Sequence, residues 1–376
     1  MIIGSIDRRF TNTWPATLLA CLFVSFFSIT AQAEAPSHEP VVDELLTLLE
    51  RRTDLHEAMD AAIETAALQG VDDVRSLAAY LDDLVTWIPT EREIIPKALS
   101  LYYIVNQAPE DKLNNDDEFN AWLKDFVTAW GGFLDTPASA AGIESFASLP
   151  NYSVDDYFEG PSGWLTFNQF FAREMRPGKR PIAAPRDDKV IVSPADAVFM
   201  GHWPITEDSN ITLKGVNWAV ADLLDNSPYK DAFKGGTYMH SFLYIDDYHR
   251  YHVPVGGTVK EIRNISGRVY LDVRRNPDGS LDVVDGDTYQ FNQERGLIVI
   301  DSPEVGLVAV LPIGMAYVSS VNLTPEVGAE LQKGDEFGFF LFGGSDIVIV
   351  FQDNGVVLDA DIGRKYLQGQ RIGELR

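Results

Sequence analysis

The sequence predicts an α+β protein, in which an N-terminal helical bundle is followed by a β-rich domain. From Val41 to about Phe133 apolar residues recur every three to four positions, as in amphipathic helices. Residues 134–163 form a junction rich in Pro, Ser, Gly and Tyr, after which short β-branched and aromatic runs alternate with Gly and Pro. Such runs are typical of strands joined by turns. A chain of 376 residues, 45% of them hydrophobic, is long and apolar enough to bury a core for both parts.

About five helices are predicted in the first part. Asp72-Asp73 and Asp116-Asp117 occupy positions where acidic residues stabilise a helix N-terminus. Gly70, Pro89 and Pro109 mark helix ends. The periodic segments are 42–49, 56–68, 74–88, 94–105 and 119–133.

In the second part the pattern predicts six strands and two short helices. The predicted strands are 190–193, 257–262, 269–274, 297–300, 307–310 and 347–351. The predicted short helices are 164–173 and 218–224.

The first 33 residues have the pattern of an export signal. Arg8 and Arg9 precede the apolar stretch 18–30, which is short for a membrane span, and Ala31-Gln-Ala33 fits the small-x-small rule for cleavage. We therefore expect cleavage after Ala33 and a periplasmic or secreted protein. Retention of this segment as a membrane anchor is the alternative.

Charge and cysteine content exclude several classes of function. The net charge is −26, and loss of residues 1–33 removes two arginines and one aspartate, which leaves −27. Such a charge disfavours binding to nucleic acid or to an anionic lipid surface. The only cysteine, Cys21, lies in the predicted signal, so a processed chain has neither a disulfide nor a thiolate metal site.

Gly343-Gly344-Ser345, just before the predicted strand 347–351, is a candidate for backbone chemistry. A serine hydroxyl attacks the preceding carbonyl only where the backbone is strained and a base removes its proton. Two glycines permit such a backbone, and an Asp–His pair activates a serine. A tight turn between strands is the alternative interpretation.

The candidate base lies in Asp247-Tyr-His249-Arg-Tyr-His252, and the candidate acid in Ser193-Pro-Ala-Asp196. Taken alone, Ser-Pro-Ala-Asp is an ordinary turn. His249 and His252, with Asp246 and Asp247 nearby, equally suit a metal-dependent hydrolase, but no third ligand stands at a diagnostic spacing.

Five segments in order, spanning about 160–370, resemble the phosphatidylserine decarboxylase family. They are Trp164–Ile182, Val192–Asp196, Leu213–Leu224, Phe242–Pro254 and Lys333–Ser345. Residues 34–150 are similar to the extra helical domain of soluble family members, some of which decarboxylate free amino acids, including tryptophan. With residues 1–33 as signal peptide, the resemblance implies 34–150 as helical domain and 151–376 as catalytic domain.

The resemblance also implies self-cleavage between Gly344 and Ser345, which converts Ser345 into a covalent pyruvoyl cofactor. Asp196, His252 and Ser345 would form the processing triad, and His249 would act in decarboxylation. The substrate would be a free L-amino acid or the serine head group of phosphatidylserine, held as a Schiff base, and we favour the former. No metal is expected, and the two cleaved chains would stay associated; a homo-oligomer is left open. An unprocessed, non-catalytic binding module is the alternative function.

One departure from the family pattern lies at the site itself. Asp346 stands where many relatives have threonine. It is expected to place a carboxylate beside the reacting bond, either slowing processing or accepting a proton.

Overall fold

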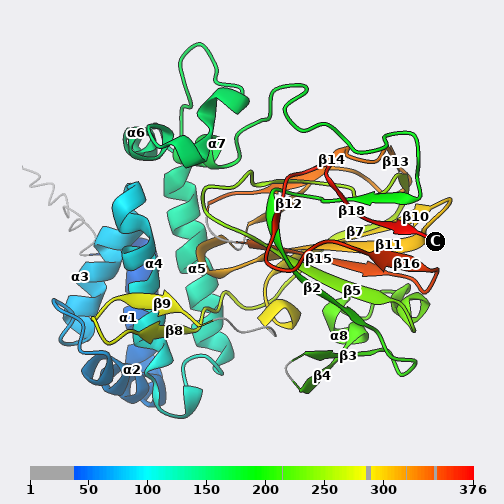
Figure 1. Ribbon diagram of the computed structural model, residues 1–376. Coiled ribbons are helices and arrows are strands. Elements are labelled where there is room, and N and C mark those ends of the chain that lie inside the picture. Colours follow the sequence, from blue (N-terminus) through cyan, green and yellow to red (C-terminus); the bar gives the residue numbers. More distant parts are fainter. Residues whose placement is uncertain (1–37, 214, 285–288, 319, 343–344) are drawn as a thin grey trace, which may run out of the picture. The chain divides into compact units, whose positions relative to one another are not determined.

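The computed structural model describes residues 38–376 except 214, 285–288, 319 and 343–344. The predicted signal at 1–33 lies outside the described residues. From His38 onward the chain forms a single unit by its contacts, with helices in its N-terminal part and strands in its C-terminal part (Figure 1). Among the described residues, no helix has the length and apolar character needed to cross a membrane.

The predicted helical bundle is confirmed. Its five α-helices are α1 (Pro40–Arg51), α2 (Thr53–Ala66), α3 (Val74–Val85), α4 (Glu91–Asn106) and α5 (Asp117–Leu134). The predicted acidic caps are present at α3 and α5. The carboxylate of Asp73 accepts the backbone N–H of Ser76, and that of Asp116 accepts those of Glu118 and Phe119.

The junction holds several single turns of helix. These are η2 (Pro137–Gly142), α6 (Ile143–Ala147), η3 (Pro150–Tyr152) and η4 (Val154–Asp156), followed by α7 (Phe167–Phe171). Other short helices elsewhere are η1 (Pro109–Asp111), α8 (Val220–Leu223), η5 (Lys230–Phe233), η6 (Tyr289–Phe291) and η7 (Ala316–Val318). The predicted short helices are confirmed in their centres only.

Two sequence predictions are wrong in part. The strand expected at 269–274 begins only at Val273, because the side chain of Gln293 bonds both the N–H and the C=O of Tyr270 and takes the place of a neighbouring strand. Trp218, expected in a helix, lies in a strand whose backbone pairs with residues 210–213.

The main sheet has eight antiparallel strands in the order β13-β7-β10-β11-β15-β5-β2-β17. Their bounds are β2 (Ala197–Pro204), β5 (Thr237–Leu243), β7 (Gly257–Ile265), β10 (Arg295–Ser302), β11 (Gly306–Gly314), β13 (Glu330–Leu331), β15 (Ser345–Phe351) and β17 (Lys365–Tyr366). One three-stranded sheet contains β1 (Val190–Val192), β18 (Arg371–Leu375) and β16 (Val356–Leu358). Another contains β12 (Val321–Leu323), β14 (Glu336–Phe340) and β6 (Arg250–His252). Two hairpins join β3 (Asn210–Leu213) to β4 (Val216–Ala219), and β8 (Val273–Arg275) to β9 (Leu281–Val283).

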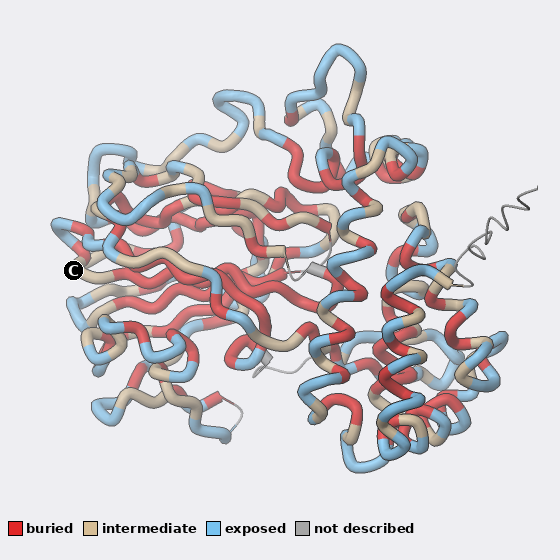
Figure 2. Tube along the Cα trace, turned by 180° about the vertical axis from the view of Figure 1, so that it is seen from behind, coloured by how far each residue is buried: buried red, intermediate tan, exposed pale blue. Residues whose placement is uncertain are grey.

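Strand β15 is buried on both faces along its whole length, as the central strands in Figure 2 are. Successive side chains alternate between the faces. Ile347 and Ile349 enter the larger hydrophobic core, which also includes the helices, whereas Val348 and Val350 enter a smaller core beneath α8. The two faces of one strand therefore have separate surroundings.

Gly338 lets three segments approach in the small sheet. A Cβ at this position would lie 2.0 Å from the carbonyl oxygen of Asn322 and 2.4 Å from the ring of Tyr251. Only glycine fits between β12 and β6 here, which accounts for this glycine in the segment leading to Ser345.

Helix α5 runs between the other helices of the bundle and the β-rich region (Figure 1). The Trp130 ring packs edge-on against Tyr317 at 4.8 Å and against Phe342 at 5.0 Å between centroids. Lys124 on the same helix pairs with Glu294 at 2.7 Å. The helical region thus packs directly against the segment that precedes Ser345.

Candidate active site

The strand order brings the predicted site residues to one end of the main sheet. Strand β15 begins at Ser345, which pairs with Leu243, the last residue of β5. On the other side of β5, strand β2 begins directly after Asp196. Neighbouring strands lie about 4.8 Å apart, so the backbones of Ser345 and Asp196 are roughly 10 Å apart. The segment with both histidines leaves β5 at this same end.

Ser345 is fully buried and lies between Leu243 on one neighbouring strand and Gly314 on the other. Its side chain shares the face of Ile347 and Ile349, by strand alternation. Among the described residues its Oγ makes no hydrogen bond. Gly344 and the Gly344–Ser345 bond lie outside the described residues. A buried hydroxyl without a partner costs free energy, which is expected where function requires it.

His252 lies beside the Asp196 segment. Its backbone N–H donates to the carbonyl of Pro194 at 2.8 Å. Its Nδ1 donates to the carbonyl of Gly334 at 2.8 Å, so Nε2 is the acceptor. This nitrogen accepts a hydrogen bond from the hydroxyl of Tyr248 at 3.1 Å. Burial lowers the pKa of His252 to about 4. The imidazole is therefore neutral near pH 7, as a general base requires.

Asp196 is buried and held by other partners. Nε and Nη2 of Arg180 donate to its two oxygens at 2.6–3.1 Å, and the backbone N–H of Gln368 donates at 2.8 Å. In the described part of the chain, no hydrogen bond joins Asp196 to His252, or His252 to Ser345. Asp196 reaches His252 through its charge, which opposes the lowering of the pKa of that imidazole.

Along the pair of strands β6 and β14, His249 lies nearer than His252 to the end that leads to Ser345. In the antiparallel pair of β6 and β14, His252 is opposite Glu336, whereas the backbone of Phe340 donates to the carbonyl of His249 at 2.9 Å. Strand β14 runs from Glu336 toward Ser345, so His249 is further along in that direction. Its Nδ1 donates to the carbonyl of Asp247 at 2.9 Å, so Nδ1 carries a proton.

An aromatic chain links His249 to the residues before Ser345. The ring of Phe171, on α7, lies 3.9 Å from that of His249 and 5.5 Å from that of Phe342, between centroids. His249 itself is fully buried. Its imidazole therefore packs, through Phe171, against the residues that lead to position 345.

Asp346 lies on the face of the sheet opposite to Ser345, together with Val348 and Val350. One carboxylate oxygen pairs with Nε2 of His240, on β5, at 3.1 Å, and both side chains are buried. The same nitrogen lies 3.3 Å from Nε2 of Gln290. The sequence placed this carboxylate beside the reacting bond, but strand alternation directs it into the smaller core.

Comparisons with known proteins identify the family. The sequence profile described as phosphatidylserine decarboxylase matches residues 167–374, more than half of the chain. The chain belongs to the phosphatidylserine decarboxylase family. The matched range includes Asp196, His249, His252 and Ser345.

Relatives come from plants, bacteria and fungi. The chain is 32% identical over 243 residues to phosphatidylserine decarboxylase proenzyme 2 of rice. The aligned residues make up 64% of this chain but only 38% of the rice protein. It is 30% identical over 239 residues to the proenzyme of Fusobacterium nucleatum, covering 63% and 77% of the two chains. It is also 30% identical over 296 residues to the decarboxylase iboD of Amanita muscaria, covering 68% and 83%.

A metal centre, the alternative considered for the two histidines, has no support in the described residues, where no group of three or more His, Cys, Asp or Glu is arranged to hold an ion. Asp247 pairs instead with Lys365. Its other oxygen accepts the backbone N–H of Tyr244 at 2.8 Å. Burial raises the pKa of Asp247 to about 6, and Lys365 opposes this shift. Asp247 thus fixes the start of the histidine segment in this member of the family.

Sequence reasoning gave no role to Arg180, Tyr248 or His240. Arg180 belongs to a segment that carries the family resemblance, but its contact with Asp196 spans 16 positions without a periodic signal. Tyr248 adjoins His249 in the sequence, and nothing in the local pattern reveals its contact with His252. His240 meets Asp346 through strand register alone, which no motif reveals.

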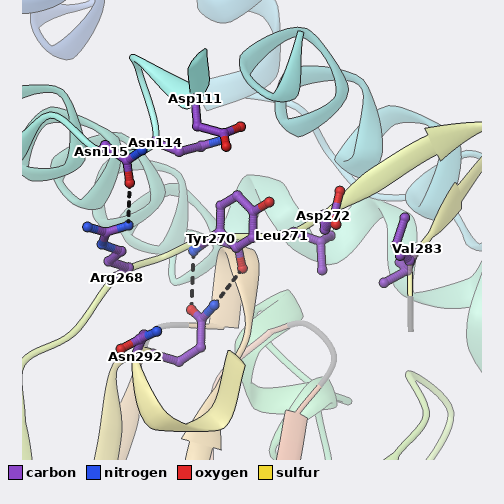
Figure 3. Close-up of a pocket in the computed structure, with 11 residues that line it drawn as sticks. Asp111, Asn114, Asn115, Arg268, Tyr270, Leu271, Asp272, Val283 and Asn292 are labelled. Carbon is purple, nitrogen blue, oxygen red and sulfur yellow. Dashed lines mark hydrogen bonds between the residues drawn. The ribbon is translucent and has the colours of Figure 1, made fainter. Parts of the chain in front are cut away.

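A polar cavity of about 280 Å³ lies away from these residues (Figure 3). Asn115, before α5, accepts a hydrogen bond from Arg268 at 3.5 Å, and Tyr270 and Asp272 also line it. Burial, with a contribution from Asp111, raises the pKa of Asp272. None of the predicted site residues lines this cavity.

Proposed function

We propose that this chain is a self-processing, pyruvoyl-dependent decarboxylase that removes the α-carboxylate of a free L-amino acid. The observation that carries the proposal is a fully buried serine, without a hydrogen-bond partner for its hydroxyl among the described residues, at the start of β15. The same end of the sheet holds His249, His252, whose pKa is lowered by burial, and the buried Asp196. Family membership supports this chemistry, and the 38% coverage of the rice relative leaves the activity itself as a proposal.

Self-processing begins when Oγ of Ser345 attacks the carbonyl carbon of Gly344 and its proton passes to Nε2 of His252. The C–N bond breaks, and an ester forms between the two residues. β-Elimination then releases the carboxylate of Gly344, and water replaces the nitrogen of residue 345, which leaves as ammonia. A pyruvoyl group at the head of β15 remains.

His252 must release Tyr248 to accept this proton, because the phenol occupies Nε2. Asp196 stabilises the imidazolium through its charge, and Arg180 holds that carboxylate in place. His252 is therefore assigned the role of processing base, with Asp196 as its orienting acid.

Position 345 fits a pyruvoyl group, because the serine side chain that becomes its methyl carbon is buried among apolar neighbours. The ketone supplies an electrophile for the amine of the substrate and an electron sink as carbon dioxide leaves. His249, beside Phe171, is placed to take up at Nε2 a proton that the substrate ammonium loses as the Schiff base forms, and to deliver it to the carbon that lost its carboxylate. The apolar surroundings exclude water from that carbon.

A free amino acid suits the charge of the chain, since −26 opposes approach to an anionic lipid surface. The relatives named phosphatidylserine decarboxylase favour a serine phospholipid as the second candidate substrate. Export through residues 1–33 is also proposed, and N-terminal sequencing of protein recovered from its host tests it.

Borohydride trapping tests the function. The processed protein is incubated with free L-amino acids, or separately with phosphatidylserine in micelles, and then reduced. We expect carbon dioxide release and a reduced adduct on residue 345 with the free amino acids. Failure to trap any amine contradicts pyruvoyl chemistry and supports a non-catalytic binding module.

A further inference from the structure

An apolar cavity of about 270 Å³ lies at the end of the sheet where β15 begins. Leu243 lines it and is the residue that pairs with Ser345 on β5. Met315 lines it and follows Gly314, which pairs with Ser345 on β11. Phe342, three positions before Ser345, completes this wall. The cavity therefore adjoins position 345 from three chain segments.

The opposite wall is helix α4. Ile94, Ala98 and Leu99 of this helix line the cavity. The family profile matches residues 167–374, so this wall lies outside the part that the chain shares with the family profile. The helical region consequently shapes a space next to the reacting residue.

Exposed apolar side chains also line the cavity. Ile95, Tyr244 and Val283 are 47%, 53% and 37% exposed, and each belongs to the lining. Large exposed apolar residues that gather at one place mark a site that binds apolar groups. Here they come from α4, from the segment after β5 and from β9.

The lining is unsuited to a phosphodiester. Among its described residues it has no lysine, arginine or histidine, and its one charged side chain is Asp246. The Asp246 carboxylate already accepts a hydrogen bond from Asn151 at 3.1 Å. Phosphate groups are bound by cationic donors, and pockets for drug-sized ligands occupy about 300–1,000 Å³. A single apolar side chain fits this space better than a phospholipid does.

We propose that the cavity binds the side chain of the substrate, and that the substrate is an L-α-amino acid with a large apolar side chain. This inference rests on the proposed function, because it needs a substrate amine bound at residue 345. Burial of such a side chain favours it over alanine by about ten- to a hundredfold in kcat/KM. Specificity is then set by α4, outside the family-matched region.

Ala98→Trp tests the cavity by filling it from the α4 wall. Processed wild-type protein and the variant are compared for kcat/KM with L-alanine, L-leucine, L-phenylalanine and L-tryptophan. We expect the variant to lose about tenfold or more with the large substrates and to stay within about threefold of wild type with alanine. Ala98→Leu, a smaller filling, shifts the ratio in the same direction and serves if Ala98→Trp does not fold.

Arg92→Trp is the matched control, because Arg92 is an exposed residue of α4 that does not line this cavity. It should keep the wild-type order of substrates. Equal kcat/KM for alanine and phenylalanine in the wild type overturns the inference, as does an unchanged order in a processed Ala98→Trp. Turnover of phosphatidylserine alone overturns it too and leaves pyruvoyl chemistry standing. An uncut wild-type chain, or one without a borohydride adduct, instead defeats the proposed function.

Discussion

The two faces of strand β15 differ sharply at neighbouring residues. Ser345 faces the larger core, where its hydroxyl lacks a partner among the described residues and the segment with His249 and His252 lies nearby. Asp346 faces the smaller core and pairs with His240. One face holds the group that must react, and the other holds a buried contact between Asp346 and His240 that joins β15 to β5. The difference indicates that a reactive strand terminus needs an anchor on its opposite face, since chain ends fray when nothing holds them.

The largest expected effect comes from Ser345→Ala on the reactive face. Without the hydroxyl no acyl shift starts, so both cleavage and decarboxylation should be lost, with activity at least about 10³-fold lower. Denaturing gels and carbon dioxide release measure the two outcomes.

Ser302→Ala is the matched control for this change. Ser302 is buried on β10, two strands from β15 in the same sheet, and its hydroxyl also has no partner among the described residues. It should be cut and active; a loss of cleavage here would show that any buried serine of the sheet has the same effect.

The two histidines on the reactive face should separate the two steps. His252→Ala should leave the chain uncut, because the base that takes the Ser345 proton is gone. His249→Ala should be cut but lose about 10²–10⁴-fold in turnover, as expected for loss of an acid–base group. Gel analysis and rate measurements distinguish them, and a fully active or uncut His249→Ala would refute this division.

Asp346→Ala breaks the anchoring face. It leaves His240 buried without its carboxylate partner, and a buried polar group that loses its hydrogen-bond partner costs about 1–3 kcal/mol in the free energy of unfolding. Urea unfolding in the uncut Ser345→Ala background measures this cost on a single chain.

Asp301→Ala on β10 is the control, because Asp301 is exposed and reaches Lys260 only at 3.8 Å. It should change the free energy of unfolding by no more than about 1 kcal/mol. An Asp346→Ala variant as stable as this control would show that the second face anchors nothing.

The smallest effect is a pH dependence of stability from His252. Folding depresses its pKa from 6.5 to about 4, so its contribution is fully present above pH 6.5 and is lost as pH falls toward 4. Asp247, whose pKa is raised to about 6, has the opposite sign and destabilises as pH rises from about 4 to 6.

Comparison of His252→Gln with its parent isolates the histidine, because Asp247 is common to both. In the Ser345→Ala background, the stability difference between parent and variant should grow in the parent's favour from pH 4 to 6.5. A difference independent of pH would show that the imidazole is not held neutral by burial.

The sequence predicted the helices well because each carries a regular apolar period and acidic caps, as at Asp73 and Asp116. It predicted β15 two residues short, since Ser345 and Asp346 are polar and only the strand pairing shows that they belong to it. Strand β5 has a mixed pattern and was missed, although it carries His240 and leads into the histidine segment.

Contacts between residues far apart in the sequence could not be predicted from local patterns. The contact of Arg180 with Asp196 and that of His240 with Asp346 depend on chain reversal and register, which local patterns do not specify. The roles of Asp196, His249, His252 and Ser345 stay predictions, now with their positions at one end of the sheet established.

Intact mass of the purified, denatured protein tests the central claim most directly. Self-processing predicts two chains, one ending at Gly344 and one spanning residues 345–376 with a pyruvoyl group in place of its amino terminus. The smaller chain should resist N-terminal sequencing, and reduction in the presence of substrate should add the mass of the substrate amine to it. A single uncut chain in protein that releases carbon dioxide would contradict the account.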